Sequence, residues 1–358
     1  MKKLLCALAL TSAASAGTLY MGVYPNAVIV FDEAQGKIVD RIPITSGLPS
    51  GLRISQDRKK IFVTTLDKSG IEIIDIATRK VVDKFTLNTE TKRYRFGGGA
   101  PDPEGKLLYA TTTEIEKKAD RFEIGKPKYT VIDLVQHKID RTVDIPPGDE
   151  NANRGGFGGP LEVSPDGKYL YQFRDKVIIL NTSDFKEVER IDLSKPELPS
   201  QEVVGFGGVV ETLNTVAGQR VTLFNSTDPI VHNRIFGIGR FNMTTRAFSF
   251  TPIGPAPNAA GAFHITPDAK TGYTITSNGA HGNRRCEFWA LDIATSRILR
   301  TAEVPCRTRF SLGMSTDGKK LYIYGAGFEI EVYDAATLKY EKTWDLKNDV
   351  TGSMIALP

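Results

Sequence analysis

The sequence predicts an all-β fold, a seven-bladed β-propeller with four antiparallel strands per blade, built as one domain from residues 17–358. Three observations support this prediction. A hairpin signature recurs along the chain, a second turn signature follows it two strands later, and the 358 residues include 33 Gly and 19 Pro, which favour tight turns. Repeats of roughly 40 to 50 residues are typical of propellers. With 41% hydrophobic and 25% charged residues, the chain can bury a large core and is not expected to be disordered.

The hairpin signature is clearest in two places. Ser164-Pro165-Asp166-Gly167-Lys168 returns as Ser315-Thr316-Asp317-Gly318-Lys319, and looser copies lie around Asp57, Glu104 and Asp268. Two strands later the chain reaches a turn of the form Asp-x-x-Thr, at Asp75–Thr78, Asp292–Thr295 and Asp334–Thr337. A last strand follows each of these turns. The pattern therefore predicts four short strands per unit, joined by tight turns.

The spacing of these landmarks predicts how many units there are. The interval from Asp166 to Asp268 is about twice the usual one, so it hides a degenerate unit, which we place at Val209–Gly254. A longer interval before Asp166 indicates an insertion at Thr113–Lys128 in the third unit. Only three strands precede the second unit, at 18–23, 27–32 and 37–44. The C-terminal residues 352–357 are expected to supply the fourth, which closes the ring and removes open sheet edges.

Residues 1–16 predict a cleaved signal peptide. Lys2 and Lys3 precede the apolar run 4–10, and Ala14-Ser15-Ala16 forms a small-residue cleavage site. Cys6 lies in this leader after Leu5, where a lipoprotein signal would have a small residue. No later stretch approaches the roughly 20 apolar residues of a transmembrane helix. We therefore expect an exported chain, periplasmic or secreted, that begins at Gly17.

The repeated units resemble the YVTN class of seven-bladed propellers over the whole mature chain, through Ser-Pro-Asp-Gly-Lys-x-Leu-Tyr at 164–171 and the strand Ile71–Asp75 that ends in a turn. The long third blade and the ending from Ser315 through Asp334-Ala335-Ala336-Thr337 to Met354 are also similar to the propeller (beta) subunit of quinohaemoprotein amine dehydrogenase. That resemblance implies a non-catalytic scaffold. Its partner subunits would carry haem and a protein-derived quinone, and this chain would hold no cofactor.

Charge and motifs exclude several other classes. The net charge of +4 is too small for a dedicated nucleic-acid binder. The sequence has no Cys-x-x-Cys-His motif for covalent haem and no His-Glu-x-x-His motif for zinc. A ring could gather His232, His264 and His281 into a metal site, but we favour the interpretation that they are ordinary loop and strand histidines and expect no metal site. A propeller hydrolase would need a metal ion held by a ring of carboxylates on its innermost strands. The five equivalent positions on these strands include only one acid, which argues against this class. They are Arg53, Ala100, Glu162, His264 and Gly313.

Basic and aromatic residues are expected on one rim of the ring, because the connections that lead into the inner strands and those between second and third strands emerge on the same side. This candidate partner or ligand rim comprises Arg93, Tyr94, Arg95, Arg154, Arg174, His281, Arg284, Arg307 and Arg309. Two interpretations stay open. The rim is a solvated charged surface, or it is a docking surface for an anion or an acidic protein, since aromatic residues and Arg anchor interfaces.

Cys286 and Cys306 are expected to form a disulfide across a hairpin of the sixth blade. Their midpoint falls inside the turn Ala294–Arg297, so they should lie nearly opposite each other on adjacent strands. An oxidising compartment would preserve the bond. The sequence thus leaves two main functional hypotheses: a scaffold that docks protein subunits of a redox complex of the amine dehydrogenase type, or a stand-alone YVTN propeller that binds a ligand or surface partner through its rim.

Overall fold

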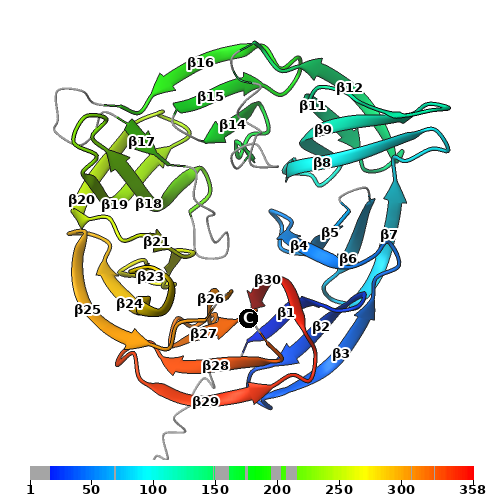
Figure 1. Cartoon of the computed structure of the whole chain (residues 1–358). Helices are drawn as coiled ribbons and strands as arrows, with labels where there is room; N and C mark the ends of the chain where they lie inside the picture. Colours follow the sequence, from blue (N-terminus) through cyan, green and yellow to red (C-terminus); the bar gives the residue numbers. More distant parts are fainter. Residues whose placement is uncertain are drawn as a thin grey trace, which may run out of the picture.

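The computed structural model describes residues 17–67, 70–147, 149, 161–173, 176–194, 203–206, 216–307, 309–325 and 327–358. The predicted leader 1–16 lies outside these residues. Figure 1 shows the chain running once around a ring of sheets, with the strands of each sheet stacked from the centre outward. Each sheet is antiparallel, and there are seven of them. The predicted all-β, seven-bladed propeller is therefore confirmed.

The seven blades, each given from its innermost to its outermost strand, use strands in chain order except in the first. Blade 1 consists of β30 (Val350–Leu357), β1 (Thr18–Val23), β2 (Ala27–Asp32) and β3 (Lys37–Pro43), and blade 2 of β4 (Pro49–Ile54), β5 (Lys60–Thr65), β6 (Gly70–Asp75) and β7 (Lys80–Thr86). Blade 3 consists of β8 (Lys92–Pro101), β9 (Leu107–Lys117), β11 (Lys128–Asp133) and β12 (Lys138–Asp144). Blade 4 consists of β13 (Leu161–Val163), β14 (Tyr169–Phe173), β15 (Lys176–Asn181) and β16 (Glu187–Asp192). Blade 5 consists of β17 (Val203–Gly205), β18 (Gln219–Thr227), β19 (Arg234–Asn242) and β20 (Phe248–Pro255). Blade 6 has an inner strand in two short pieces, β21 (Ala259–Ala260) and β22 (His264–Ile265), followed by β23 (Thr271–Asn278), β24 (Arg285–Asp292) and β25 (Arg297–Val304). Blade 7 consists of β26 (Ser311–Met314), β27 (Lys320–Tyr324), β28 (Glu329–Asp334) and β29 (Tyr340–Asp345).

The ring is closed by the C-terminal strand. β30 pairs antiparallel with β1, with Thr18 opposite Leu357 and Tyr20 opposite Ile355. Alternate residues of β30 face opposite neighbours, as the pleat of a strand requires. Met354 packs with blade 7 and Ile355 with blade 2. The predicted closure is confirmed, and the strand starts at Val350, slightly earlier than expected.

Apolar contacts between blades hold the ring together. Within the described chain there is one buried hydrophobic cluster at each of the seven junctions between neighbouring blades. Strand β5 shows how a single strand serves two junctions. Ile61 and Val63 face blade 1, whereas Phe62 between them faces blade 3. Strands buried on both faces explain why these segments are nearly continuous runs of apolar residues.

Hydroxyl–carboxylate hydrogen bonds explain both turn signatures. At the hairpin between the first and second strands, the hydroxyl of Ser164 donates to Asp166 Oδ1 at 2.6 Å, and Ser315 donates to Asp317 at 2.7 Å. Blades 2 and 6 repeat this contact with Ser55–Asp57 and Thr266–Asp268. In the Asp-x-x-Thr turns the carboxylate of Asp334 accepts from both the backbone N–H and the hydroxyl of Thr337. Such side-chain contacts replace backbone partners in tight turns.

Two blades depart from the regular pattern. In blade 3 the predicted insertion lengthens β9 and adds β10 (Phe122–Ile124), which pairs with the end of β9. In blade 5 the inner strand β17 begins at Val203, so the predicted start of that unit at Val209 was wrong. The reason is that the chain between β17 and β18 is long and lacks the tight-turn signature, which left nothing in the sequence to mark the inner strand.

Candidate docking surface

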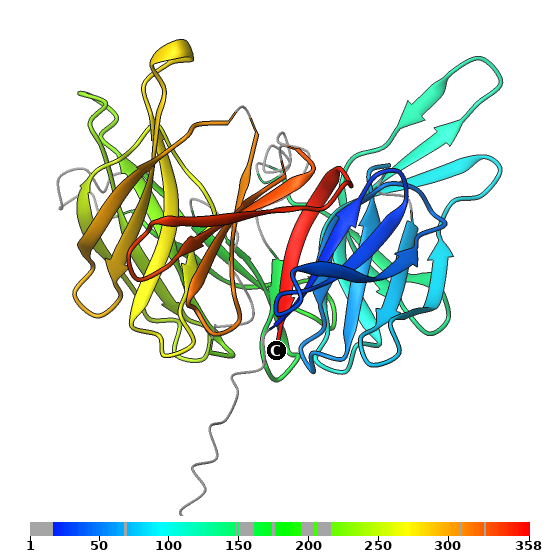
Figure 2. The same ribbon diagram turned by 90° about the horizontal axis from the view of Figure 1, so that it is seen from below.

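The ring has two chemically different faces. We call the face that carries the connections between blades, and those between the second and third strands of each blade, the upper face. The lower face carries the Ser-x-Asp and Asp-x-x-Thr turns. Figure 2 shows the hairpin β9–β10 and the short 3-10 helix His281–Asn283 projecting from the upper face, whereas the C-terminus lies on the lower one. The predicted rim residues that the structure describes all belong to the upper face.

Three predicted rim residues lie on β8, which extends beyond the regular blade. Arg93 and Arg95 are exposed, and Tyr94 between them is half-buried. The Tyr94 hydroxyl donates to Glu114 Oε2 at 2.7 Å, and Lys92 Nζ lies 2.8 Å from the same carboxylate. Burial and this carboxylate raise the pKa of Tyr94, so it stays a neutral donor. The tyrosine thus fixes β8 to β9 and leaves the two arginines facing solvent.

The blade 6 to blade 7 connection holds two further rim residues in different environments. Arg307 lies against two carboxylates: its Nη1 is 3.0 Å from Glu329 Oε1, and its Nη2 pairs with Glu331. Its side chain is only 20% exposed. Arg309 is exposed, and its Nε donates to the carbonyl of Gly325 at 3.4 Å. Arg307 therefore anchors its loop, whereas Arg309 is the residue available to a partner.

The remaining predicted rim residues are distributed as follows. Arg284 is exposed next to the 3-10 helix that contains His281, at the tip of the β23–β24 hairpin. Arg154 and Arg174 lie outside the described residues. The exposed arginines that the structure places on the upper face include Arg93, Arg95, Arg284, Arg285 and Arg309, together with Arg121 at the tip of the β9–β10 hairpin and Arg234 at the start of β19.

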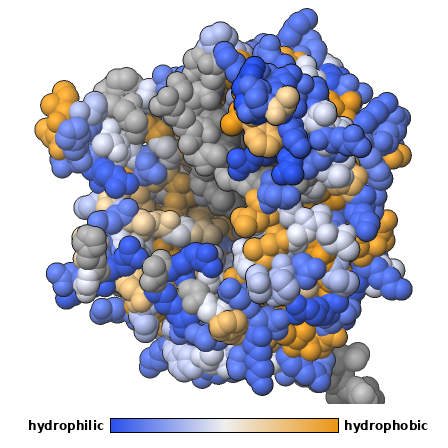
Figure 3. Space-filling model, turned by 45° about the vertical axis from the view of Figure 1, so that its right-hand side comes forward, coloured by the Kyte–Doolittle hydropathy of each residue, from blue (hydrophilic) through white to orange (hydrophobic). Residues whose placement is uncertain are grey.

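Exposed apolar residues gather on the same face, which the sequence reading missed. Seven of the fourteen large hydrophobic residues exposed in the described chain lie in the second-to-third-strand connections of five blades. We call them the apolar tips: Tyr24, Leu66, Phe122, Ile124, Ile230, Val231 and Phe328. Phe122 is 64% exposed and Ile230 is 84% exposed. Figure 3 shows such apolar groups as separate patches among hydrophilic ones, around a hollowed region. Apolar side chains at loop tips, such as Ile230-Val231, were the available signal.

The lower face differs in this respect. Among the described residues, its exposed large hydrophobics are Val135 and Val216, and the other exposed ones lie on the outer strands or at their ends. Exposed apolar side chains are common on protein surfaces, but their concentration in the connections of one face distinguishes that face from the other. The upper face therefore has the composition of an interface, with apolar groups and arginines side by side.

An ionic network surrounds the inner strands of blades 2 to 5. The Arg53 guanidinium donates to the carbonyls of Gly99 and Leu161, the latter at 3.2 Å, and so links three inner strands. Arg220, which is 0% exposed, pairs with Glu162 and lies 4.4 Å above the Phe173 ring. Burial lowers the pKa of both guanidiniums, yet arginine remains charged at any physiological pH. Sequence reasoning identified Arg53 and Glu162 but missed Arg220, since nothing marks a buried Arg within a strand.

The five predicted inner positions are structurally equivalent, because each pairs with an aromatic residue on the second strand of its blade. The pairs are Arg53–Phe62, Ala100–Tyr109, Glu162–Tyr171, His264–Tyr273 and Gly313–Tyr322. His264 is buried, with Nε2 2.9 Å from the carbonyl of Leu312. Within the part of the chain that the structure describes, no group of three His, Cys, Asp or Glu side chains is arranged to hold a metal ion.

A cleft of about 600 Å³ opens between blades 5 and 6. Its walls are mostly apolar, with Phe224, Phe236 and Phe263, and its polar groups include Asn225 and Arg234. These residues come from the upper halves of β18 and β19 and from the connection that leads into blade 6. A mostly apolar cleft with a few polar groups has the character of a small-molecule site.

The predicted disulfide is present. Cys286 on β24 is bonded to Cys306, which follows β25, and their Cα atoms are 5.2 Å apart. Cys286 is buried in the junction between blades 6 and 7. The bond therefore ties the start of the Arg307–Arg309 connection to the blade beneath it.

Comparisons with known proteins agree with the architecture. No family model matches this sequence, and no curated protein is significantly similar to it. Among solved structures, a functionally unknown protein from Desulfotomaculum acetoxidans shares 11% identity with a TM-score of 0.59, covering 96% of this chain and 99% of its own. Dihydro-heme d1 dehydrogenase NirN shares 13% identity with a TM-score of 0.55, and the match covers 98% of this chain and 77% of the NirN chain. Apo AztD from Citrobacter koseri shares 13% identity with a TM-score of 0.53, and the match covers 96% of this chain and 99% of the AztD chain.

These comparisons establish a class and no more. At such low identities the likeness concerns the fold, so the chain is a seven-bladed β-propeller. None of these three structures is the amine dehydrogenase propeller that the sequence resembles. No helix in the described chain is long and apolar enough to cross a bilayer.

Proposed function

We propose that this protein is an exported docking propeller that holds a partner protein against its upper face. The observation that carries the proposal is the joint presence of the apolar tips and of exposed arginines on one face of the ring. Aromatic residues and Arg dominate the binding energy of interfaces, and patches of both are rare on surfaces that stay in water. The arginines favour a partner whose contact surface bears carboxylates.

The partner that the sequence favours is a subunit of a periplasmic redox complex of the amine dehydrogenase type. This part of the proposal rests on the resemblance of the long third blade and of the chain ending, and the long third blade also carries the projecting β9–β10 hairpin. Haem and a protein-derived quinone would then reside in partner subunits. The chain itself would contribute no catalytic residue and no cofactor, and its task would be to position its partners.

Export is part of the same proposal. The leader pattern at 1–16 predicts it, and the disulfide between Cys286 and Cys306 supports it, because such bonds persist in oxidising compartments. The periplasm or the outside of the cell would satisfy both observations.

A second candidate is a stand-alone propeller that binds a small molecule. The cleft between blades 5 and 6 favours it, since Asn225 and Arg234 could orient a polar group of a ligand while the phenylalanines cover its apolar part. In this case the Arg234→Ala variant loses ligand binding, and variants of the arginine rim retain it.

Charge reversal on each face tests the proposal. Arg95→Glu with Arg284→Glu should reduce co-purification of a partner from the native periplasm at least tenfold, because like charges then face the partner. The matched control is Lys59→Glu with Lys270→Glu, two exposed lysines in the lower-face turns. Both pairs should melt like the wild type, since surface substitutions seldom change stability by more than about 0.5 kcal/mol. Equal partner recovery with both pairs would contradict the proposal.

The isolated chain provides the second test. Purified alone it should be colourless and should not reduce a dye in the presence of primary amines, since it would supply no redox group. Adding the co-purified partner should restore any such activity. Visible absorbance or amine-dependent dye reduction by the chain alone would refute the scaffold role.

A further inference from the structure

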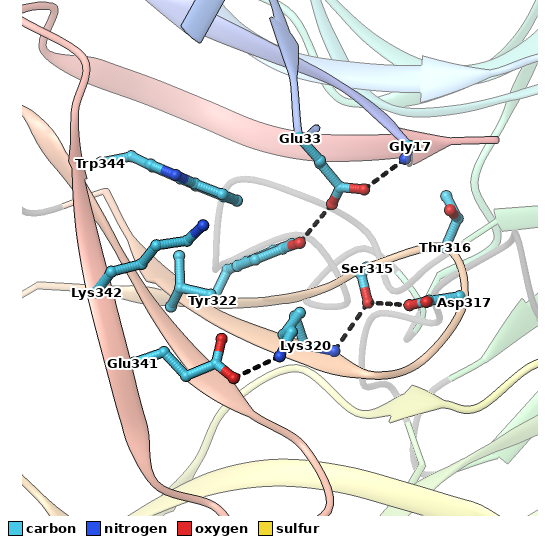
Figure 4. A pocket seen from close by; sticks show the side chains of 11 residues that line it. Gly17, Glu33, Ser315, Thr316, Asp317, Lys320, Tyr322, Glu341, Lys342 and Trp344 are labelled. Carbon is cyan, nitrogen blue, oxygen red and sulfur yellow. Dashed lines mark hydrogen bonds and ion pairs between the residues drawn. The ribbon is translucent and has the colours of Figure 1, made fainter. Parts of the chain in front are cut away.

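A half-buried carboxylate, Glu33, lies at the junction between blades 1 and 7 on the lower face. Figure 4 shows its side chain between Gly17 and Tyr322. Its Oε2 accepts a hydrogen bond from the Gly17 N–H at 2.7 Å, and its Oε1 accepts one from the Tyr322 hydroxyl. The carboxylate borders a cavity of about 190 Å³ that also contacts Asp317, Lys320, Lys342 and Trp344. Through Glu33 and Tyr322, Gly17 of blade 1 is thereby connected to blade 7.

The described groups that act most strongly on Glu33 do not include a cation. Two of them are acids, Asp317 and Asp32, and burial raises the pKa of Glu33. The lysines nearby have other partners. Lys320 pairs with Glu341 and lies 3.6 Å from Asp334, and Lys342 Nζ lies 5.0 Å above the Trp344 ring. A half-buried carboxylate with acidic neighbours is stabilised when a positive charge lies beside it.

Gly17 packs closely against the groups around Glu33. A Cβ atom on Gly17 would lie 2.6 Å from Glu33 Oε2, 2.8 Å from Thr316 Oγ1 and 3.0 Å from the carbonyl oxygen of Leu357. The carbonyl of Gly17 in turn accepts from the Glu33 backbone N–H at 3.1 Å. A larger residue at this position would displace the Glu33 carboxylate and the Thr316 hydroxyl, whereas glycine leaves its nitrogen directed at the carboxylate.

We infer that Glu33 is the receptor for the new N-terminus that processing creates at Gly17. Hydrolysis of the Ala16–Gly17 peptide bond by the export peptidase adds the hydroxyl of water to the Ala16 carbonyl carbon and a proton to the Gly17 nitrogen. That nitrogen then takes up a second proton and becomes an α-ammonium group. The ammonium lies against Glu33 and supplies the missing positive charge, with Tyr322 donating to the other carboxylate oxygen. This step rests on the predicted cleavage site and is independent of the docking proposal.

Processing should reverse the pH dependence that Glu33 gives to folding. In a chain extended beyond Gly17, the raised pKa of Glu33 favours its protonated form, so its contribution to stability is lost as pH rises through that pKa. In the processed chain the ammonium lowers the pKa of Glu33, and its contribution is lost as pH falls instead. The amine pKa rises above its ordinary value of about 7.7 to 8.0, so the ion pair is lost at high pH. Tyr322 stays protonated, because burial and Glu33 raise its pKa.

A four-member cycle of variants tests the inference. Chains that begin at Gly17 or at Ala16 are prepared by cleavage of a fusion, each with Glu33 or with Glu33→Gln. At pH 7 the Glu33→Gln substitution should lower the melting temperature of the chain that starts at Gly17 and should leave the Ala16 chain unchanged or more stable. Asp292→Asn is the control, since this turn carboxylate lies in blade 6, bonds to Thr295 and should have equal effects in both chains. Equal effects of Glu33→Gln in both chains would overturn the inference.

Two direct measurements accompany the cycle and do not require the variant to fold. Intact mass of the exported protein should give a chain that starts at Gly17, and any other start would contradict the assignment. The α-amine of the folded wild type should react with an amine-acylating reagent at least tenfold more slowly than in the unfolded chain. An amine that reacts equally fast in both states is not buried against Glu33.

Discussion

At the scale of single residues, a buried arginine and its carboxylate partner lie at the junction of blades 4 and 5. Arg220 is fully buried among aromatic rings, and Glu162 on the neighbouring inner strand is its carboxylate partner. A buried pair of this kind adds little net stability compared with apolar residues, but breaking it leaves a charge without compensation. The pair therefore fixes how these two blades fit together.

Single substitutions in this pair should be far more harmful than the double one. Glu162→Gln should destabilise the protein by about 3 to 5 kcal/mol, because it leaves the Arg220 guanidinium buried without its carboxylate. Adding Arg220→Met should recover most of that loss, since the methionine fills the same space without a charge. Urea denaturation measures both effects. Additive losses in the double variant would show that the two residues do not act as a pair.

The hairpin aspartates should make the fold sensitive to acid. The Ser164 hydroxyl and the N–H groups of the turn lower the pKa of Asp166, and Asp57 and Asp268 are held in the same way. For a lowered folded pKa, the stabilisation is complete above the ordinary Asp pKa of about 3.9 and is lost as pH falls through the folded value. NMR titration of Asp166 should show this, and Ser164→Ala should move its pKa upward. An unchanged titration in the variant would argue against the hydroxyl as the cause.

At the scale of elements, turn chemistry made most of the fold predictable. The Ser-x-Asp and Asp-x-x-Thr signatures correspond to hydrogen bonds that close the turns, so they marked blades 2, 4, 6 and 7 from sequence. Blade 5 was misplaced because its inner strand is separated from β18 by a long connection without such a turn. Where local hydrogen bonding does not fix an element, tertiary pairing does, and a single sequence carries no signal of it.

The disulfide should stabilise the sixth blade by restricting the unfolded chain. Cys286 and Cys306 are 20 residues apart. Closing a loop of this size contributes roughly 3 kcal/mol in the chain-entropy estimate. The double variant Cys286→Ser with Cys306→Ala should therefore unfold at a lower urea concentration than the wild type. Its free energy of unfolding should be smaller by about the same amount as this loop-closure contribution. Titration of the unreduced, unfolded wild type should detect no free thiol in the mature chain, and two reactive thiols would contradict the bond.

At the scale of the whole molecule, the ring depends on one non-local strand pairing. β30 contributes Met354, Ile355 and Leu357 to the cores on its two sides, and Met354 N–H donates to the Tyr324 hydroxyl at 3.0 Å. Without β30, β1 becomes an open inner edge with unpaired backbone groups. Closure therefore stabilises both neighbouring blades at once.

Deletion of Thr351–Pro358 should cost far more than removal of an ordinary tail. Three large apolar side chains are lost from the core, each contributing about 1.5 to 3 kcal/mol, so the loss should reach about 5 kcal/mol or more. Thermal melting of the truncated chain measures it. A truncated protein with an unchanged melting temperature would mean that the ring does not need this strand.

The upper face shows how far sequence alone could define the candidate site. The arginines of β8 and of the loops were predicted to share a rim because propeller connections alternate between faces, and Arg93, Arg95, Arg284 and Arg309 are exposed there. Arg307 was included, but its pairing with Glu329 and Glu331 depends on a contact between separate connections, which the sequence does not reveal. The apolar tips were missed because they are one or two residues in each of five separate connections, and only the ring brings these connections to one face.

Photo-crosslinking in the native host tests the docking account most directly. A photoreactive amino acid is placed at Phe122, Ile230 or Phe328 on the upper face, and at Val135 or Val216 on the lower face, all of them exposed. The account predicts that the three upper positions capture the same partner protein and that the two lower positions do not. Capture of that partner from the lower positions, or of none from the upper ones, would contradict it.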